Sequence, residues 1–304
     1  MTYDLAIIGG SAAGASAAVY AARRGLKFVV VAKDLGGEVA LSGDVENWLG
    51  IKKTSGVDLS LQFSEHMKSY SPDIKEGYSV TSITKDAAGI FSITTEQPET
   101  IQAKSVIIAS GVHSRELGIP GEKEFRLKGV SYCTVCDGPL FKGKRTVTIG
   151  GGNSALESAL MMADIASEVT VINKNPAFKG EKILLDNLLK KSNVKIVYNA
   201  ITIEIYGEGV AKGLKYKDES GNIVDVPMEG AFVHIGQIPN SQMIPPECEK
   251  DQFSYVKVNL DGSTSCPGLF AAGDVTNIPH KQIIIAAGQG ATAALSAVQY
   301  INRL

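Results

Sequence analysis

An apolar run near the amino end of the chain leads into a turn of small residues. The run is "YDLAII", the turn is "GGSAAG" at 9–14, and an alanine-rich stretch follows as far as Arg24. A second apolar run, "KFVVV", comes directly afterwards. Continuous apolar runs on either side of a helical stretch predict strand, turn, helix and strand, the ~30-residue βαβ unit of a parallel sheet.

The same order recurs in the middle of the chain. "RTVTI" leads into "GGGNSA" at 150–155, then a helical stretch to about Ala166, and then "EVTVI". Two such units predict two nucleotide-binding folds rather than a solenoid repeat.

The remaining pattern indicates how the two folds are joined. "FSITTE" alternates as an antiparallel strand should, and "KSVIIASG" and "GLFAAGDV" each read as a strand entering a turn. The stretch 281–303 predicts a closing alanine-rich helix, while "RELGIPGE" and the end of "AFVHIGQIPNS" read as linkers. We therefore predict an α/β protein with two Rossmann-like domains, the second inserted into the first. The first domain comprises 1–115 and 241–304, and the second comprises 116–240.

Length and charge agree with this organisation. A chain of 304 residues is long for one core and favours two domains. A net charge of −2 gives no sign of nucleic acid or of an acidic membrane as a partner. The uncharged run 5–22 contains a turn signal and follows Asp4 rather than basic residues, which argues against a signal peptide or a membrane span. With only four cysteines, we expect a cytoplasmic protein.

The two glycine turns are candidate phosphate sites, because backbone N–H groups and the helix dipole meet a pyrophosphate there. The turn at 150–155 keeps the G-x-G-x-x-A spacing. In the first turn Gly9 and Gly14 hold the outer positions, but Ser11 stands where the middle glycine would be. We expect Ser11 to point aside or to displace the ligand slightly; a turn without ligand is the alternative.

The residues after each second strand leave the choice of nicotinamide open. After Val31 no clear acid follows, and Asn173 replaces the acid that favours NAD. Lys174 and Lys179 offer positive charge for a 2′-phosphate, but without an arginine fork.

Two of the cysteines lie close together in "SYCTVCDGPLF", and a C-x-x-C pair can serve zinc, a structural crosslink or redox chemistry. Zinc needs four ligands, and no second ligand pair stands nearby. A crosslink over two intervening residues constrains the unfolded chain very little. Redox chemistry remains, with Cys133 and Cys136 as nucleophile and resolving thiol and Asp137 as proton source or ordinary turn acid. We expect Cys266 to be a small buried residue and Cys248 a bystander in a surface loop.

The motifs "SYCTVCDGPLFKGK", "TIGGGNSALESA" and "TSCPGLFAAGDVT" together resemble the low-molecular-weight thioredoxin reductases over nearly the whole chain. "CDGPLFKGKR" and "PHKQIIIAAGQGATAALSA" resemble especially the flavoprotein subunit of bacterial alkyl hydroperoxide reductase. That relative has extra N-terminal thioredoxin-like domains, whereas this chain starts at the flavin strand, so we expect a separate thioredoxin- or glutaredoxin-like protein as substrate. The family's basic His-Arg-Arg cluster is replaced here by Asn173-Lys174-Asn175, with Pro176 next.

The resemblance implies FAD in the first domain and NAD(P)H in the second, which carries the redox pair. It implies that Cys136 faces the flavin, that Cys133 attacks the substrate disulfide and that Asp137 donates the proton. It also implies a homodimer, and rotation of the inserted domain about linkers near 115–121 and 236–241. The implied FAD residues are Gly9, Ser11, Ala12, Ala13, Gly14, Gly37, Glu38, Asn47, Gly111, Gly273, Asp274, Lys281, Gln282 and Ile283. The implied nicotinamide residues are Gly152, Asn153, Ser154, Ala155, Lys174 and Lys179, with the donor leaning to NADPH over NADH.

The sequence thus predicts a reductase that moves electrons from NAD(P)H through FAD and the Cys133–Cys136 disulfide to a thioredoxin-like protein, without a metal. One alternative is a flavin dithiol oxidase that passes electrons to oxygen. Another is a reductase that takes electrons from ferredoxin or a deazaflavin, and a redox-sensing or binding module is a third.

Overall fold

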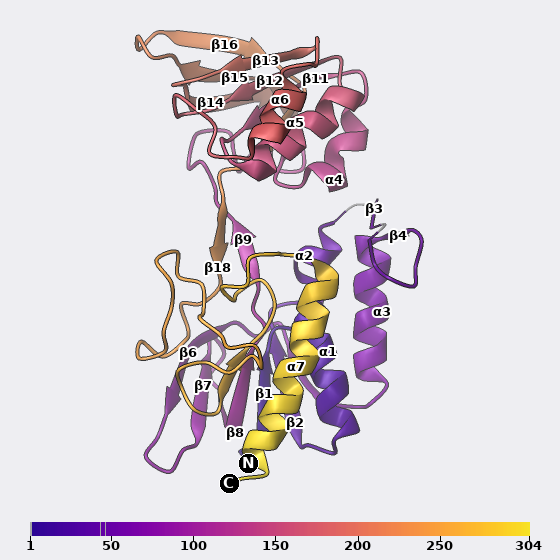
Figure 1. Ribbon diagram of the computed structural model, residues 1–304, viewed down its shortest axis with the longest axis vertical. Helices are drawn as coiled ribbons and strands as arrows, with labels where there is room; N and C mark the ends of the chain where they lie inside the picture. Colours follow the sequence, from indigo (N-terminus) through magenta and orange to yellow (C-terminus); the bar gives the residue numbers. More distant parts are fainter. Residues whose placement is uncertain (1, 43, 46) are drawn as a thin grey trace. The chain divides into compact units, whose positions relative to one another are not determined.

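The computed structural model describes residues 2–42, 44–45 and 47–304 and divides into two compact units (Figure 1). Unit 1 holds the residues up to His113 together with Ile238–Leu304, and unit 2 holds Ser114–Gln237. The boundaries expected from the sequence, after residues 115 and 240, fall close to these.

Unit 1 is built on a seven-stranded sheet in the order β5-β2-β1-β8-β7-β6, with β19 paired to β8. Its strands are β1 (Thr2–Ile8), β2 (Phe28–Ala32), β5 (Asp73–Glu76), β6 (Val80–Lys85), β7 (Phe91–Thr95), β8 (Thr100–Ile108) and β19 (Leu269–Ala271). A short pair, β3 (Asp44–Val45) and β4 (Thr54–Ser55), forms a separate two-stranded sheet. The helices are α1 (Ala12–Arg23), α2 (Gly37–Ala40), α3 (Gly56–Lys68) and α7 (Ile283–Ile301).

The predicted first βαβ unit is confirmed: β1 and β2 are parallel and joined through α1. Strand β8 changes partners along its length, pairing antiparallel with β7 at Thr100–Ala103 and parallel with β19 at Val106–Ile108. The carboxyl ends of β1, β2, β8 and β19 therefore meet at one edge, where ligands of open α/β sheets bind.

Helix α7 closes unit 1, as the sequence predicts. By length and composition alone it could span a membrane. Its alanine face is instead buried in the core that α1 also lines, and Ala293, Ala294 and Ala297 have no exposed surface. Figure 1 shows α7 running alongside α1 within this unit. One face of α7 therefore packs on the core of unit 1, while most of its residues are not buried.

Unit 2 contains a five-stranded sheet, in the order β10-β17-β11-β12-β13, in which all neighbours are parallel. These strands are β10 (Val130–Ser131), β11 (Arg145–Ile149), β12 (Glu168–Ile172), β13 (Val194–Val197) and β17 (Gly230–Val233). The helices are α4 (Thr134–Asp137), α5 (Asn153–Ile165) and α6 (Lys182–Leu188), with a 3₁₀ turn at Gly138–Phe141. The second predicted strand–turn–helix–strand unit, β11-α5-β12, is confirmed.

The sequence interpretation did not include a three-stranded antiparallel sheet that also belongs to unit 2. It comprises β14 (Ile201–Glu208), β15 (Val210–Lys217) and β16 (Ile223–Pro227). The two connections between the units contain β9 (Val112–Ser114) and β18 (Gln237–Pro239), which pair with each other.

Candidate functional site

The predicted redox cysteines lie at the start of α4 in unit 2. Cys133 is disulfide-bonded. Its backbone N–H donates to the Ser131 hydroxyl at 3.0 Å, and its carbonyl accepts from the Asp137 N–H at 3.1 Å, which closes the turn of this four-residue helix. Cys136 belongs to α4, but its side chain lies outside the described part of the structure. The pairing Cys133–Cys136 and its order of action therefore stay predictions.

A buried polar cluster that the sequence interpretation missed anchors α4 from the inside. Thr134 Oγ1 lies 2.6 Å from Ser158 Oγ of α5 and 2.7 Å from His234 Nε2, just beyond β17. Ser158 Oγ in turn lies 3.5 Å from Thr148 Oγ1 of β11. Burial lowers the pKa of His234 to about 4. The sequence signal for this cluster was the histidine in "AFVHIG", which directly follows a buried parallel strand.

The first glycine turn has the shape that a strand-to-helix phosphate site needs. A side chain at Gly14 would collide with the carbonyl of Gly9, whose φ of 111° lies in the region that favours glycine. Ser11 points aside, because its hydroxyl donates to the Gly36 carbonyl at 2.7 Å. The amino end of α1 consequently has no side-chain cap. Its first N–H groups suit an anion, so the turn fits a pyrophosphate.

Several predicted FAD residues meet around this turn. Gly37 lies against Ser11, and a side chain at Gly273 would contact Ala13. Asn47 donates to the Gln282 side chain at 3.0 Å, which joins the loop after α2 to the start of α7. Helix α7 also begins without a side-chain cap.

Three further predicted FAD residues are placed by the elements around them. Glu38 follows Gly37 in α2, and Ile283 is the first residue of α7. Gly111 is engaged with the connection between the units, because its carbonyl accepts from Asn240 N–H at 3.0 Å. Glu38 therefore adjoins the turn through Gly37, Ile283 follows the Gln282 that binds Asn47, and Gly111 belongs to the connection.

Asp274 and Lys281 form the partly buried charged pair of this region. Burial raises the pKa of the Asp274 carboxyl, and the Lys281 charge opposes that rise. Burial likewise lowers the pKa of Lys281, against the attraction of Asp274 and Asp251. The Lys281 ammonium also lies 4.5 Å from the centre of the Tyr255 ring. A polar ligand bound beside these residues would therefore meet the Lys281 ammonium and the Asp274 carboxyl.

The second glycine turn is open at Gly152, whereas Gly150 and Gly151 pack against His234 and Asn173. No heavy atom lies within 4 Å of a side chain placed at Gly152, which caps the amino end of α5 without a side-chain hydrogen bond. The turn therefore has room for a close backbone approach to a dinucleotide. The two following residues, Asn153 and Ser154, open the helix, and Ala155 is buried.

The loop after β12 folds back on this turn. Asn173, which stands where an NAD-binding acid is common, is fully buried, and its side chain accepts from Asn175 N–H and donates to the Ala177 carbonyl. Asn153 exchanges two hydrogen bonds with Glu181, at 2.7 and 3.0 Å. Asn173 thus organises the loop, while Glu181 sets a carboxylate beside the turn.

The two predicted phosphate-binding lysines are both exposed. Lys179 is tied to the turn through its backbone, because its N–H donates to the Gly151 carbonyl at 2.7 Å. Lys174 follows Asn173 directly. The structure therefore brings Lys179 to the glycine turn and puts Lys174 at the end of β12.

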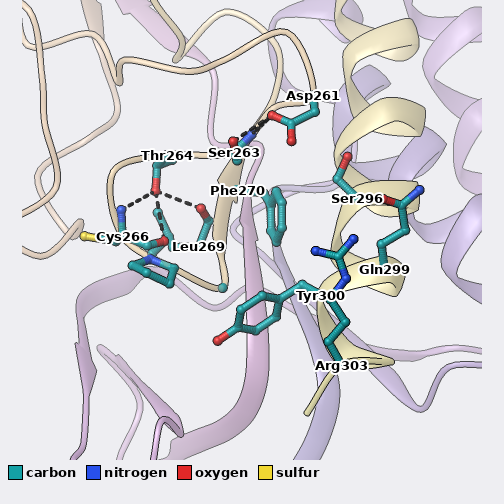
Figure 2. A pocket seen from close by; sticks show the side chains of 12 residues that line it. Asp261, Ser263, Thr264, Cys266, Leu269, Phe270, Ser296, Gln299, Tyr300 and Arg303 are labelled. Atoms are coloured by element: carbon teal, nitrogen blue, oxygen red, sulfur yellow. Dashed lines mark hydrogen bonds between the residues drawn. The ribbon is translucent and has the colours of Figure 1, made fainter.

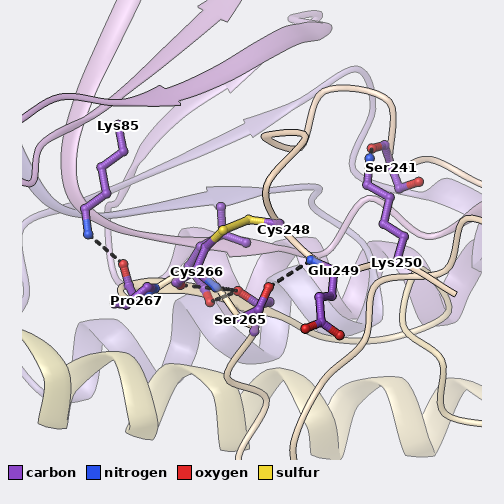
Figure 3. The surroundings of a disulfide bond; sticks show 10 residues. Lys85, Ser241, Cys248, Glu249, Lys250, Ser265, Cys266 and Pro267 are labelled. Carbon is purple, nitrogen blue, oxygen red and sulfur yellow. Dashed lines mark hydrogen bonds between the residues drawn. A yellow bond between two sulfur atoms is a disulfide. The ribbon is translucent and has the colours of Figure 1, made fainter.

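The expectation of a surface bystander at Cys248 was wrong, and the expectation of a small buried residue at Cys266 holds in part but missed its disulfide. Cys248 and Cys266 form a disulfide with a Cα–Cα distance of 5.5 Å. Cys248 is 2% exposed and belongs to the core with Val256 and Leu269, so it is no surface bystander. Cys266 packs against that core and is partly buried. Figure 3 shows the bridge between two loops, and the Ser265 hydroxyl beside it accepts from a backbone N–H of the other loop.

A pocket of about 200 Å³ lies at the far end of unit 1 from the glycine turn. Figure 2 shows Tyr300 of α7, and Arg303 just beyond the helix, near Phe270. It adjoins the amino end of β19, whereas parallel sheets bind ligands at their carboxyl ends. Among the described residues, no group of three or more histidine, cysteine or acidic residues could hold a metal ion.

Comparison with known proteins agrees with this arrangement. A family model described as pyridine nucleotide-disulphide oxidoreductase matches residues 3–294. An alkyl hydroperoxide reductase subunit of Escherichia coli is 39% identical over 99% of this chain and 58% of its own length. A Bacillus subtilis protein named NADH dehydrogenase is 41% identical over 99% of this chain and 59% of its own length. The chain thus spans less than two thirds of the length of these relatives.

A solved structure covers the chain from end to end. The thioredoxin reductase of T. acidophilum is 40% identical, covers 99% of each chain and superposes with a TM-score of 0.78. The chain therefore belongs to the pyridine nucleotide-disulphide oxidoreductase family, and its fold is similar to that of a thioredoxin reductase.

Proposed function

We propose that this protein is an FAD-dependent reductase that passes electrons from a nicotinamide dinucleotide through the Cys133–Cys136 pair to a thioredoxin- or glutaredoxin-like protein. The observation that carries the proposal is the disulfide-bonded Cys133 directly before α4, in the unit that also contains the open turn at Gly152. A redox disulfide and a dinucleotide turn in one unit are what such a reaction requires.

The FAD site would comprise the turn from Gly9 to Gly14, the Asn47–Gln282 contact and the Asp274–Lys281 pair. The uncapped amino ends of α1 and α7 support this assignment, since they leave N–H groups for phosphate or ring oxygens. When bound, FAD supplies two-electron transfer between nicotinamide and disulfide.

The chain's own residues then perform thiol–disulfide exchange. The Cys133 thiolate attacks one sulfur of the partner's disulfide, forming a mixed disulfide and releasing the partner's first sulfur as a thiolate, which takes a proton from Asp137. The Cys136 thiolate next attacks the Cys133 sulfur. This step releases the partner's second sulfur as a thiolate and re-forms the Cys133–Cys136 disulfide; the second thiolate takes its proton from water, so two electrons pass to the partner with one proton from Asp137 and one from solvent.

We further propose that the electron donor is NADPH or NADH, bound at Gly152, Asn153, Ser154 and Ala155. Exposed Lys174 and Lys179 support NADPH. The Glu181 carboxylate on Asn153 and the engaged amide of Asn173 weaken the case for tight binding of either dinucleotide. That observation keeps ferredoxin or a deazaflavin as the alternative donor.

Anaerobic stopped-flow flavin reduction tests the donor. Mixing the yellow protein with NADPH or NADH should bleach flavin absorbance within one turnover. If neither dinucleotide reduces the flavin but a chemically reduced ferredoxin or a deazaflavin does, the alternative donor is correct. Release of peroxide driven by a dithiol, without nicotinamide, would identify an oxidase instead.

We propose a homodimer in the cytoplasm. Val57 and Leu61 are four residues apart on α3 and are 51% and 54% exposed, which gives one helix face apolar area for a second copy. Light scattering coupled to gel filtration should give twice the chain mass, and a Leu61→Glu variant should give a monomer.

We also infer that the units rotate about the connecting strands, because one cysteine pair must meet both flavin and a protein partner. Solution X-ray scattering of oxidised and reduced protein should differ if reduction shifts this equilibrium.

A further inference from the structure

His234 contacts α4 through its side chain, and its backbone is held by the parallel sheet of unit 2. Its backbone N–H donates to the Ile149 carbonyl at 2.8 Å, at the carboxyl end of β11. A side chain on Gly150 would collide with the His234 carbonyl, so the two backbones lie in close contact. The ring therefore starts from a rigid part of unit 2. It reaches Thr134, the residue that follows Cys133 in the C-T-V-C motif, at 2.7 Å.

The hydrogen bonds at Nε2 suit a neutral imidazole in either tautomer. If Nε2 carries no proton, Thr134 donates to it and Ser158 donates to Thr134. If Nε2 carries the proton, His234 donates to Thr134, Thr134 to Ser158, and Ser158 to Thr148. Burial keeps the pKa of His234 near 4, so the ring is neutral at pH 7 in either arrangement.

Helix α4 is too short to be stable without contacts outside itself. It has four residues, and helices of this length do not form alone in water. Val135, its second residue, is 54% exposed, whereas Thr134 is 4% exposed and faces inward. The Thr134 hydroxyl is thus the polar anchor that joins the redox motif to the core of unit 2.

We propose that His234 is a positioning residue for the redox disulfide: through Thr134 it holds α4, and with it Cys133, in the pose of the oxidised state. The inference rests on the proposed function, because it takes Cys133 and Cys136 as the exchanging pair. The contact exists with Cys133 disulfide-bonded, and the proposal requires it to be weaker in the reduced form, since only a contact that differs between the two states shifts their equilibrium. Loss of the contact should make the disulfide easier to reduce.

The test measures the thiol–disulfide equilibrium of the holoenzyme rather than its turnover. Protein equilibrated with dithiothreitol buffers is alkylated, and mass spectrometry follows the peptide that contains Cys133 and Cys136. His234→Leu and Thr134→Val should each raise the equilibrium constant for reduction about tenfold, equivalent to about 30 mV. His234→Gln keeps a polar atom near the position of Nε2 and should restore it to within about threefold of wild type.

Two controls separate this role from a general effect of substitution. His66→Gln changes a histidine on α3 of unit 1 and should leave the equilibrium unchanged. The double variant His234→Leu with Thr134→Val should shift no further than either single variant, because both remove one contact. If His234→Leu fails to fold, Thr134→Val and the double variant of Thr134→Val with His234→Gln still decide the matter.

An unchanged equilibrium in Thr134→Val, or equal shifts in His234→Gln and His234→Leu, would overturn the proposal. The measurement needs no donor and no partner protein. If the reductase function fails while the equilibrium shifts as expected, the positioning role stands without it, so the two failures are distinguishable.

Discussion

The two cysteine pairs of this protein have opposite surroundings. Cys133 precedes a four-residue helix whose Val135 is half exposed, and the predicted partner Cys136 is in the same short helix. Cys248 is 2% exposed and joins Cys266 across a sequence separation of 18. A pair that must be attacked by a thiolate needs access, and a pair that only restrains the chain does not.

The difference shows that the number of residues between two cysteines indicates whether their disulfide serves redox chemistry or stability. A disulfide across two residues restrains the unfolded chain little, so it has little structural use. A disulfide across a longer loop removes more freedom from the unfolded chain and stabilises the folded state even when buried. The first pair is therefore the one to test by activity, and the second the one to test by stability.

The largest expected effect is on activity. Cys136→Ser should lower reduction of a thioredoxin-like protein by on the order of 10³-fold or more, because no resolving thiol remains. Flavin reduction by the dinucleotide should be unaffected. The matched double variant Cys248→Ser with Cys266→Ser should keep turnover within about twofold of wild type. Loss of turnover in that double variant would break the division between the two pairs.

The next largest effect is on stability, where loss of the Cys248–Cys266 pair should matter more than loss of the Cys133–Cys136 pair. Replacing Cys248 and Cys266 with serine should lower the free energy of unfolding of unit 1 by about 3 kcal/mol, from the loop that the bridge closes. Replacing Cys133 and Cys136 should lower the free energy clearly less. Urea unfolding followed by tryptophan fluorescence suits unit 1, since Trp48 packs on its core. Equal losses in both variants would contradict the assignment.

Acidification should destabilise unit 2, which carries the first pair, through His234. His234 has a folded pKa of about 4 against an ordinary value of 6.5, so the unfolded chain takes up its proton first as pH falls. The stability that the neutral His234 contributes to the folded state is fully present above pH 6.5 and is lost as the pH falls toward 4. The loss should reach about 2 kcal/mol between pH 7 and pH 5.

The pH effect is isolated by comparing variants at the two pH values. His234→Gln should lose less stability than wild type over this range, while the Cys248→Ser, Cys266→Ser double variant should lose as much as wild type. The measurement is urea unfolding with hydrogen exchange in unit 2. A loss in His234→Gln equal to that in wild type would show that other groups carry the effect.

Local patterns were enough to predict the two βαβ units and the closing helix. β11 and β12 have the bounds expected from "RTVTI" and "EVTVI", because β-branched Val, Thr and Ile residues favour strands. The antiparallel strands β14–β16 were missed, since alternation identifies a strand but not its partner. Glu204 and Lys215, for example, meet at 2.9 Å only once the register is set.

Contacts between distant residues could not be predicted from the same patterns. The Cys248–Cys266 bridge depends on two loops that come together only when β19 joins β8. The His234–Thr134 contact joins residues 100 positions apart. Ser11 was recognised as unusual, but its outward turn depends on the Gly36 carbonyl, which the sequence does not place. The geometry of a turn is therefore predictable from the sequence, and contacts that rest on packing are not.

The smallest expected effect concerns which donor reduces the first pair. Lys174→Gln and Lys179→Gln should each weaken NADPH binding about five- to tenfold, about 1 kcal/mol for an exposed charge pair, and leave NADH binding unchanged. Lys190→Gln removes an exposed lysine beyond α6 and is the matched control. Titration of the oxidised protein with each dinucleotide gives the dissociation constants. Equal weakening for both dinucleotides would show that the lysines act on the pyrophosphate they share rather than on the 2′-phosphate.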